Sequence, residues 1–255
     1  MAQPTYSLRA LVLRRTKLGE SDLILTMLGA DGSLAKAVAK GARKPKSSFA
    51  ARTEPLCVAD LLLARGRSLD IVKEARLASA HDGLRRTVEG SAAAMPVLEL
   101  LGRMAQPSLA NPRLFQVADR ALNVMDSADD GHRLAVAAAC LLKILAFSGL
   151  KPSLEVCIGC GESVELQEGQ RVPFSAIEGG VACAACRPSF ETEPVDAATL
   201  CWGQYFLGST FDDIAAGPAD LSATFAVLHL VQALVRAHVG SPLKSLEFLF
   251  TSGLF

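Results

Sequence analysis

Four cysteines in this 255-residue chain occur as two closely spaced pairs, which limits how the chain around them can fold. Cys157 and Cys160 form one Cys-x-x-Cys pair, and Cys183 and Cys186 form a second pair after 22 intervening residues. Each pair can present two thiolates on one tight turn, and four such soft anionic ligands complete a tetrahedron around Zn²⁺. The spacing therefore predicts a structural zinc site, closed to water, within a zinc ribbon at about residues 154–190.

Disulfide bonds are the alternative for the same four cysteines. The N-terminus lacks a basic region followed by an apolar core and a small-residue cleavage site, so we predict no signal peptide and an intracellular protein. That compartment disfavours disulfides. The remaining cysteines, Cys57, Cys140 and Cys201, occur singly in apolar surroundings.

The charges of the chain, which balance to zero overall, are unevenly distributed. Residues 1–80 hold 14 Lys/Arg against 7 Asp/Glu, whereas residues 81–255 hold 12 against 19. This division suggests two modules, the first suited to a polyanion such as nucleic acid and the second to a protein or to no charged partner. The alternative is that each excess of charge only solvates its own module.

The first module consists of short apolar runs separated by turn residues. The runs lie at residues 8–13, 23–28, 34–39, 56–64 and 69–77. The sequences Gly-Ala-Asp-Gly at 29–32 and Arg-Gly-Arg-Ser at 65–68 are typical of hairpin connections. Five strands in about 80 residues fit a small closed barrel, of which the OB-fold is the kind that handles oligonucleotides.

The second module has the longer periodicity of helices. Apolar periodic segments lie at residues 92–104, 112–125, 134–150, 197–207 and 221–239. Asn111 before Pro112 and Asp130 can cap the helices that follow them, and Gly149 with Pro152 ends the helix from 134. The most apolar segment contains Lys143 and is short for a membrane span, so we predict no membrane partner.

The predicted fold class is therefore α+β. A five-stranded OB-fold barrel at residues 1–80 precedes a mainly α-helical domain at residues 81–255 that carries the four-cysteine zinc ribbon.

Catalytic patterns are lacking in the sequence, which has no GxGxxG after a strand, no GxxxxGK[ST], no GxSxG and no HExxH. Structural or solvated roles account for the residues that could act as catalysts, because helix caps and the helix dipole already explain paired carboxylates. These residues are His81, His132, His229, His238 and the pairs Asp129-Asp130 and Asp212-Asp213. We predict that the chain is not an enzyme.

The connection between the third and fourth strands, AKGARKPKSSFAARTEP at residues 39–55, carries five cations and one acid, Glu54. Lys36 and Lys40 share strand parity and so point to one face, and Pro45 limits collapse of the loop. Lysine and arginine bind phosphates without reading bases, through counterion release. The module has two aromatic residues, Tyr6 and Phe49, so base stacking is expected to be minor.

We predict that cations in and just before this basic stretch bind DNA phosphates, and that cations of the first strand do not. The predicted site consists of Lys36, Lys40, Arg43, Lys44, Lys46 and Arg52. The controls, on and just after the first strand, are Arg9, Arg14, Arg15 and Lys17.

Four stretches of the chain match the pattern of a known family. They are ALVLRRTKLGESDLILTMLGADGSLAKAVAKGARKPKSS at residues 10–48, EPL at 54–56, the Gly-Leu-x-Pro-x-Leu-x-x-Cys-x-x-Cys-Gly run at 149–161, and CRP at 186–188. Together they resemble the RecO family of bacterial recombination and repair proteins, over nearly the whole chain.

The resemblance implies a non-catalytic recombination mediator. Such a protein binds single- and double-stranded DNA, anneals complementary strands, contacts the C-terminal tail of single-strand-binding protein, and works with RecR to load RecA. It also implies a cytoplasmic, nucleoid-associated protein, monomeric on its own, in which zinc is a stabiliser. For the acidic tail we consider Arg113, Arg120, Arg133 and Lys143, although surface salt bridges explain the same residues.

Two alternatives remain open from the sequence. The chain could be a zinc-ribbon and OB-fold RNA-binding factor in transcription or translation, or a protein scaffold. Annealing of complementary DNA strands, compared with binding of structured RNA, distinguishes the three.

Overall fold

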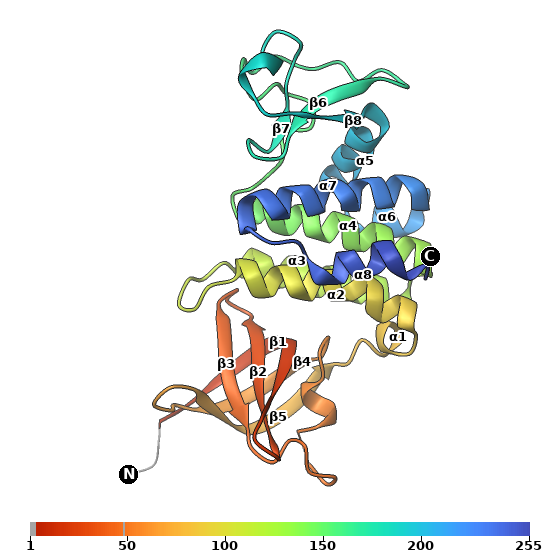
Figure 1. Ribbon diagram of the computed structural model, residues 1–255. Coiled ribbons are helices and arrows are strands. Elements are labelled where there is room, and N and C mark those ends of the chain that lie inside the picture. Colours follow the sequence, from red (N-terminus) through yellow and green to blue (C-terminus); the bar gives the residue numbers. More distant parts are fainter. Residues whose placement is uncertain (1–3, 48) are drawn as a thin grey trace. The chain divides into compact units, whose positions relative to one another are not determined.

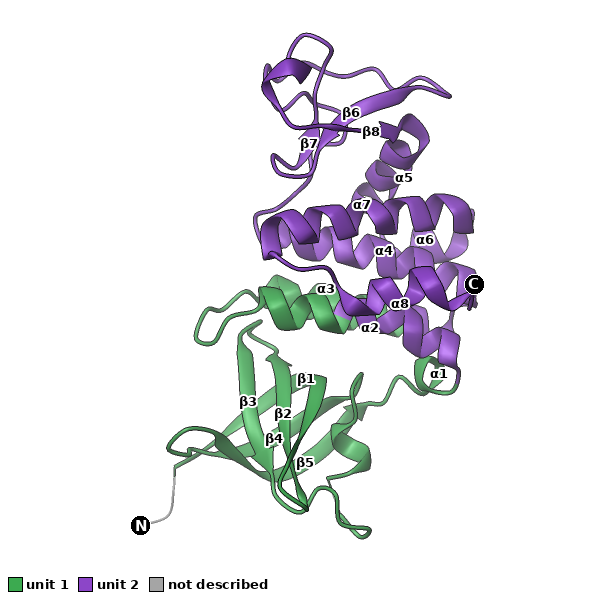
Figure 2. Cartoon of the chain, in the orientation of Figure 1, with its two compact units in different colours: residues 1–86, 98–123 green, residues 87–97, 124–255 purple. Residues whose placement is uncertain are grey.

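The computed structural model describes residues 4–47 and 49–255. The first three residues of the predicted N-terminal domain, and Ser48 of the basic stretch, lie outside the described residues. The chain divides into two compact units, Met1–Arg86 with Leu98–Asn123, and Thr87–Val97 with Val124–Phe255 (Figure 2). The predicted domain boundary at residue 80 stays a prediction.

Five strands of the first unit close into a barrel (Figure 1). They are β1 (Thr5–Leu18), β2 (Asp22–Gly29), β3 (Leu34–Ala39), β4 (Val58–Ala64) and β5 (Asp70–Ser79). Their order around the barrel is β1-β2-β3-β5-β4, with β3 and β5 parallel and the other neighbours antiparallel. The predicted five-stranded N-terminal barrel is confirmed, and the long connection from β3 to β4 contains a short 3-10 helix, η1 (Ala51–Thr53).

Alternating side chains of the strands form the barrel core. On β2, the core residues are Leu23, Leu25 and Met27, and the residues between them face outward. A bulge between Val12 and Arg14 shifts the register of β1 against β2. Strand β1 continues past this bulge to Leu18 as a polar hairpin arm, well beyond the predicted strand end at residue 13, and the bulge exchanges the faces of its later residues.

Helices make up most of the remaining chain, which confirms the predicted α+β class. They are α1 (Asp82–Arg85), α2 (Val88–Met104), α3 (Pro112–Ser127), α4 (Asp130–Phe147), α5 (Ala197–Gly208), α6 (Phe211–Ala216), α7 (Leu221–Val239) and α8 (Lys244–Ser252). The five predicted helices are present. The pattern did not predict α1, α6 and α8, which are too short to show a clear period.

In the second unit, α4 and α7 form the centre of the helical core. Helix α4 buries eleven residues from Leu134 to Leu145 and contacts α5, α6 and α7. Among the described residues, α7 is a helix long and apolar enough to cross a membrane by length and composition alone. The inner helix of a folded core meets the same criterion, and α7 buries Val227, Leu230 and Leu234 among its neighbours.

The N-terminus of α4 is capped by Asp129, one residue before the predicted cap Asp130. The Asp129 carboxylate accepts a hydrogen bond from the backbone N–H of His132 at 3.1 Å. The His132 ring places Nδ1 2.6 Å from the other Asp129 oxygen and Nε2 3.1 Å from the carbonyl oxygen of Gly217. His132 therefore joins the start of α4 to the end of α6.

This bridge favours a charged imidazolium and a charged carboxylate. Hydrogen bonding to the Gly217 carbonyl, followed by that to Asp129, raises the pKa of His132. The backbone N–H of His132, and then its ring, lower the pKa of Asp129. The two shifts make the stability of the unit depend on pH.

Replacing His132 with glutamine is expected to lower the free energy of unfolding by about 1 kcal/mol or less, because the pair is partly exposed. The raised pKa of His132 means that its contribution is complete below the ordinary value of 6.5 and is lost as pH rises through the folded value. The lowered pKa of Asp129 means that its contribution is complete above 3.8 and is lost at lower pH. Urea unfolding at about pH 5.5 and about pH 8.5 checks this difference. Equal losses at both values would contradict it.

The cysteines lie in a small three-stranded ribbon. Its strands are β6 (Arg171–Ser175), β7 (Gly180–Val181) and β8 (Glu193–Asp196), in the order β7-β6-β8, and a 3-10 helix, η2 (Arg187–Ser189), follows the second cysteine pair. The turn at residues 176–179 joins β6 to β7.

Candidate metal centre and nucleic-acid interface

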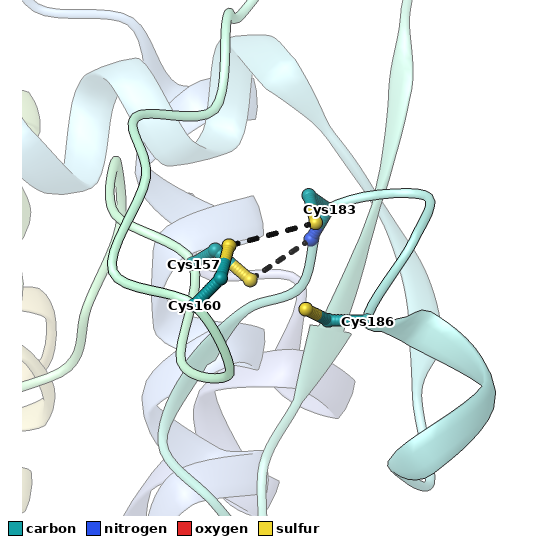
Figure 3. Close-up of side chains that lie close together, drawn as sticks. All are labelled: Cys157, Cys160, Cys183 and Cys186. Carbon is teal, nitrogen blue, oxygen red and sulfur yellow. Dashed lines mark hydrogen bonds between the residues drawn. The ribbon is translucent and has the colours of Figure 1, made fainter.

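The four cysteines of the two Cys-x-x-Cys pairs meet at one point. Cys157 and Cys160 precede the ribbon strands, Cys183 and Cys186 follow β7, and all four sulfur atoms lie within 4.8 Å of one another (Figure 3). Tetrahedral coordination with Zn–S bonds of about 2.3 Å places sulfur atoms about 3.8 Å apart. The Sγ atoms of Cys160 and Cys183 are 3.9 Å apart. The cluster can therefore bind a metal ion with little rearrangement.

Local backbone chemistry shapes the first cysteine turn. A Cβ atom at Gly159 would lie 2.9 Å from both Cβ and Sγ of Cys186, so glycine alone fits between the two turns. Gly161 has a φ of +77°, in the left-handed region that glycine tolerates. These requirements explain the glycines of the CIGCG sequence.

Backbone amides favour a thiolate in the cluster. The N–H groups of Cys183 and Gly159 point at Sγ of Cys157 at 3.3 Å and 3.4 Å. Led by the Cys183 amide, such donors lower the pKa of Cys157 to about 6. Hydrogen bonding to Cys183 instead raises the pKa of Cys186 to about 12. A divalent cation would stabilise all four thiolates together, which amides alone do not.

The structure separates the four clustered cysteines from the other three. All seven cysteines are free thiols, so the disulfide alternative receives no support. Cys57 and Cys140 are buried as single residues. Cys201 lies on α5 and is exposed, beside Trp202, Tyr205 and Pro218.

The predicted phosphate-binding residues are all exposed, but they occupy three places on the barrel. Lys36 lies on β3 and faces outward. Lys40, Arg43 and Lys44 gather at the turn between β1 and β2, and Lys46 follows in the same loop. Arg52 lies in η1 and donates to the carbonyl oxygen of Ala75 on β5, at 3.1 Å.

The beginning of the basic loop is held in place by hydrogen bonds. Arg43 donates through Nη1 to the carbonyl oxygen of Gly19 at 3.0 Å and through its backbone N–H to that of Ser21 at 2.9 Å. The backbone N–H of Gly41 donates to the Asp22 carboxylate at 2.8 Å, and this bond is the main cause of the lowered pKa of Asp22. Arg43 therefore anchors the loop.

A further cation, Arg14, joins Lys36 on the outer face of the barrel. Arg14 pairs with Thr26 across β1 and β2, and Thr26 pairs with Lys36 across β2 and β3. Direct cross-strand partners share a face, so the two cations flank Thr26. Arg14 is therefore not a suitable control, and the bulge that brings it to this face is not visible in the sequence pattern. Arg9 remains a suitable control, since it lies across from Asp60 on the β4 side.

The two aromatic residues of the barrel are engaged within the chain. The guanidinium of Arg65 lies 4.3 Å from the centre of the Tyr6 ring, and the Tyr6 hydroxyl donates to Asp70. Phe49 packs against the barrel core. Neither ring is presented as an open stacking platform.

The residues considered for the acidic tail also have contacts of their own. Arg133 donates to the Met125 carbonyl at 3.0 Å and to Asp130 at 2.8 Å, and Lys143 donates to the Leu207 carbonyl at 2.7 Å. Arg113 and Arg120 lie on α3 and are not without partners.

Structural roles account for several of the groups considered as catalysts. His81 is 2% exposed and its Nδ1 lies 2.7 Å from the carbonyl oxygen of Leu56. His229 stacks on Phe250, with ring centres 3.8 Å apart. Asp213 forms a capping box with Thr210 at the start of α6.

A closed barrel with outward cations, combined with helices and a four-cysteine ribbon, defines a class of proteins suited to holding a nucleic-acid backbone. Two family models identify the class more closely. Residues 1–81 match the model described as "Recombination protein O N terminal", and residues 85–247 match "Recombination protein O C terminal". The chain belongs to the RecO family.

Full-length relatives agree with this assignment. The chain is 32% identical to the DNA repair protein RecO of Bifidobacterium adolescentis over 252 residues, which cover 96% of this chain and 99% of the relative. It is 29% identical to that of Dehalococcoides mccartyi, over 92% of this chain and 89% of the relative. The RecO of Rubrobacter xylanophilus is 30% identical, over 92% and 90%. Membership makes the chain a DNA repair and recombination protein of a non-enzymatic kind.

Proposed function

We propose that the chain is a recombination mediator that binds single- and double-stranded DNA and anneals complementary strands. With RecR, it helps to load RecA onto DNA coated by single-strand-binding protein, whose C-terminal tail it contacts. The observation that carries the proposal is the match of both RecO models, which together span residues 1–81 and 85–247. It acts in the cytoplasm, at the nucleoid.

The barrel surface supports a mechanism based on phosphates. Exposed Lys36, Lys40, Lys44 and Lys46 give affinity for a backbone without reading sequence, which annealing of arbitrary strands requires. Arg14 extends this surface across β2. A strand held through its phosphates keeps its base edges available for pairing with a second strand.

Zinc is the metal that we propose for the cysteine cluster. Four thiolates with no open position suit Zn²⁺ in a structural role, and Cys157, Cys160, Cys183 and Cys186 would hold it. The ion would join the two cysteine turns and so stabilise the ribbon. It would supply no chemistry to annealing.

An annealing assay tests the proposed function. Complementary oligonucleotides carrying a donor and an acceptor fluorophore, each coated with a bacterial single-strand-binding protein, are mixed with and without the chain. Energy transfer is expected to rise several-fold faster with the chain, because it neutralises phosphates on both strands. RecR is expected to be needed for the further step, displacement of the coat by RecA.

A matched binding assay with structured RNA excludes the main alternative. No acceleration of annealing, together with tight RNA binding, would contradict the mediator and support an RNA-binding factor. Neither activity would indicate a protein scaffold.

A further inference from the structure

A groove unrelated to the barrel lies in the second unit, between the ribbon and α7. It has a volume of about 330 Å³ and is bordered by β6, β8 and the outer side of α7. Phe174 and Leu230 form its buried floor, and Ile177, which is 55% exposed, stands at its edge. Ala226 and Ala233 lie two helical turns apart on α7, and their small side chains leave space on the α7 side of the groove. A volume of this size accepts one or two apolar side chains.

The rim of the groove is acidic. Glu191, Glu193 and Asp196 line it, with Arg171 as the single cation, and Arg171 lies 3.3 Å from Asp196. Within the described residues, Glu191 and Glu193 are exposed and form no ion pair. His229, also on the rim, adds no positive charge near neutral pH, because burial lowers its pKa. The groove therefore repels phosphates and acidic peptides.

One wall of the groove is the edge of a sheet. All four residues of β8 line the groove, and β8 is the last strand in the order β7-β6-β8. An edge strand can pair with an added extended peptide, although Pro194 removes one N–H donor. The groove thus combines an apolar floor, an acidic rim and an exposed strand edge.

We propose that this groove binds an extended peptide segment of a partner protein, with apolar side chains entering the groove and lysine or arginine side chains beside them. The apolar side chains would cover Phe174 and Leu230, and the basic ones would pair with Glu191 and Glu193. This surface is opposite in charge to the barrel, so a partner can bind here while the barrel holds DNA. The proposal does not depend on the annealing activity.

Synthetic peptides test the chemistry with the full chain. The probe is a fluorescein-labelled heptapeptide of alternating lysine and leucine, followed by fluorescence anisotropy at about 0.15 M ionic strength. Saturable binding is expected, and a counterpart with glutamate in place of lysine, or serine in place of leucine, is expected not to bind. Absence of saturable binding by the lysine and leucine peptide would overturn the proposal.

Two groove variants and one matched control locate the site. Glu191→Lys with Glu193→Lys, and separately Ala233→Trp, which fills the groove, are each expected to weaken binding by about tenfold or more. Glu165→Lys with Glu168→Lys makes the same charge change at exposed positions of the ribbon outside the groove, and should preserve binding. Circular dichroism and DNA binding confirm that each variant is folded.

Two outcomes of these measurements would overturn the proposal. If the control Glu165→Lys with Glu168→Lys loses as much peptide binding as the groove variants, the peptide is attracted by the overall negative charge of the unit and not by the groove. A dimer in sedimentation equilibrium that the groove variants dissociate would assign the groove to a second copy of the chain.

Discussion

Replacing Cys183 with serine is expected to lower the free energy of unfolding by about 4 kcal/mol or more, because three ligands no longer hold the metal that joins the two cysteine turns. Wild-type protein purified with reductant is expected to contain one zinc ion per chain, and the variant little. Metal analysis by mass spectrometry and denaturant unfolding, with and without a chelator, measure both quantities. Cys157→Ser should behave in the same way.

Cys201→Ser provides the matched control for this prediction. It makes the same chemical change at an exposed cysteine outside the cluster, and should alter stability by about 0.5 kcal/mol or less. DNA binding by the folded fraction of Cys183→Ser should change little, because the predicted phosphate contacts lie in the other unit. Freshly purified, reduced wild-type protein without bound metal would refute the zinc proposal.

Replacing Lys44 and Lys46 with alanine is expected to weaken DNA binding nearly equally for all base sequences. If both side chains contact phosphates, the plot of log affinity against log salt should flatten by about 0.7 per contact on single strands and about 0.9 on duplex. Fluorescence anisotropy over a series of salt concentrations measures the slope. Both lysines are exposed in the loop, so the fold should persist.

Arg9→Ala with Arg76→Ala removes the same charge elsewhere on the barrel. These two residues flank Asp60 across β1, β4 and β5, away from the basic loop. The control should keep most of the wild-type salt slope. If the arginine variant loses the salt slope while the lysine variant keeps it, the phosphate site is on the β4 side of the barrel. If the slope changes in neither variant, the positive charges of the barrel serve only to keep the barrel soluble.

Apolar periodicity was sufficient to predict the barrel and the five long helices. Alternate residues of the strands are apolar, and so is every third to fourth residue of the helices, because these are the residues that become buried. The bulge after Val12 was not predictable, since it depends on pairing with β2. The bulge moves Arg14 to the face of Lys36, and β1 continues beyond it to Leu18. A sequence pattern that ends the strand at residue 13 misplaces this cation.

The candidate sites differ in the same way. The cysteine cluster was predictable because both turns are encoded locally, by spacing and by glycine. The groove beside β8 was not, because Glu193 and Ala233 are far apart in sequence and become neighbours only when the ribbon packs on α7. Likewise, nothing in the sequence indicates that Arg43 donates to Gly19 rather than facing solvent.

The bonds of Arg43 to the β1–β2 turn, and the packing of Phe49 on the barrel, limit how much of the loop can follow a DNA strand. Residues 44–48 lie between these points in the sequence, and five residues reach about 18 Å at most when extended. With one phosphate per strand about every 3.4 Å along a duplex, that reach corresponds to about five phosphates. A loop contact of this length would leave the bases on either side of the loop uncovered, so that a complementary strand could begin to pair there before the protein leaves.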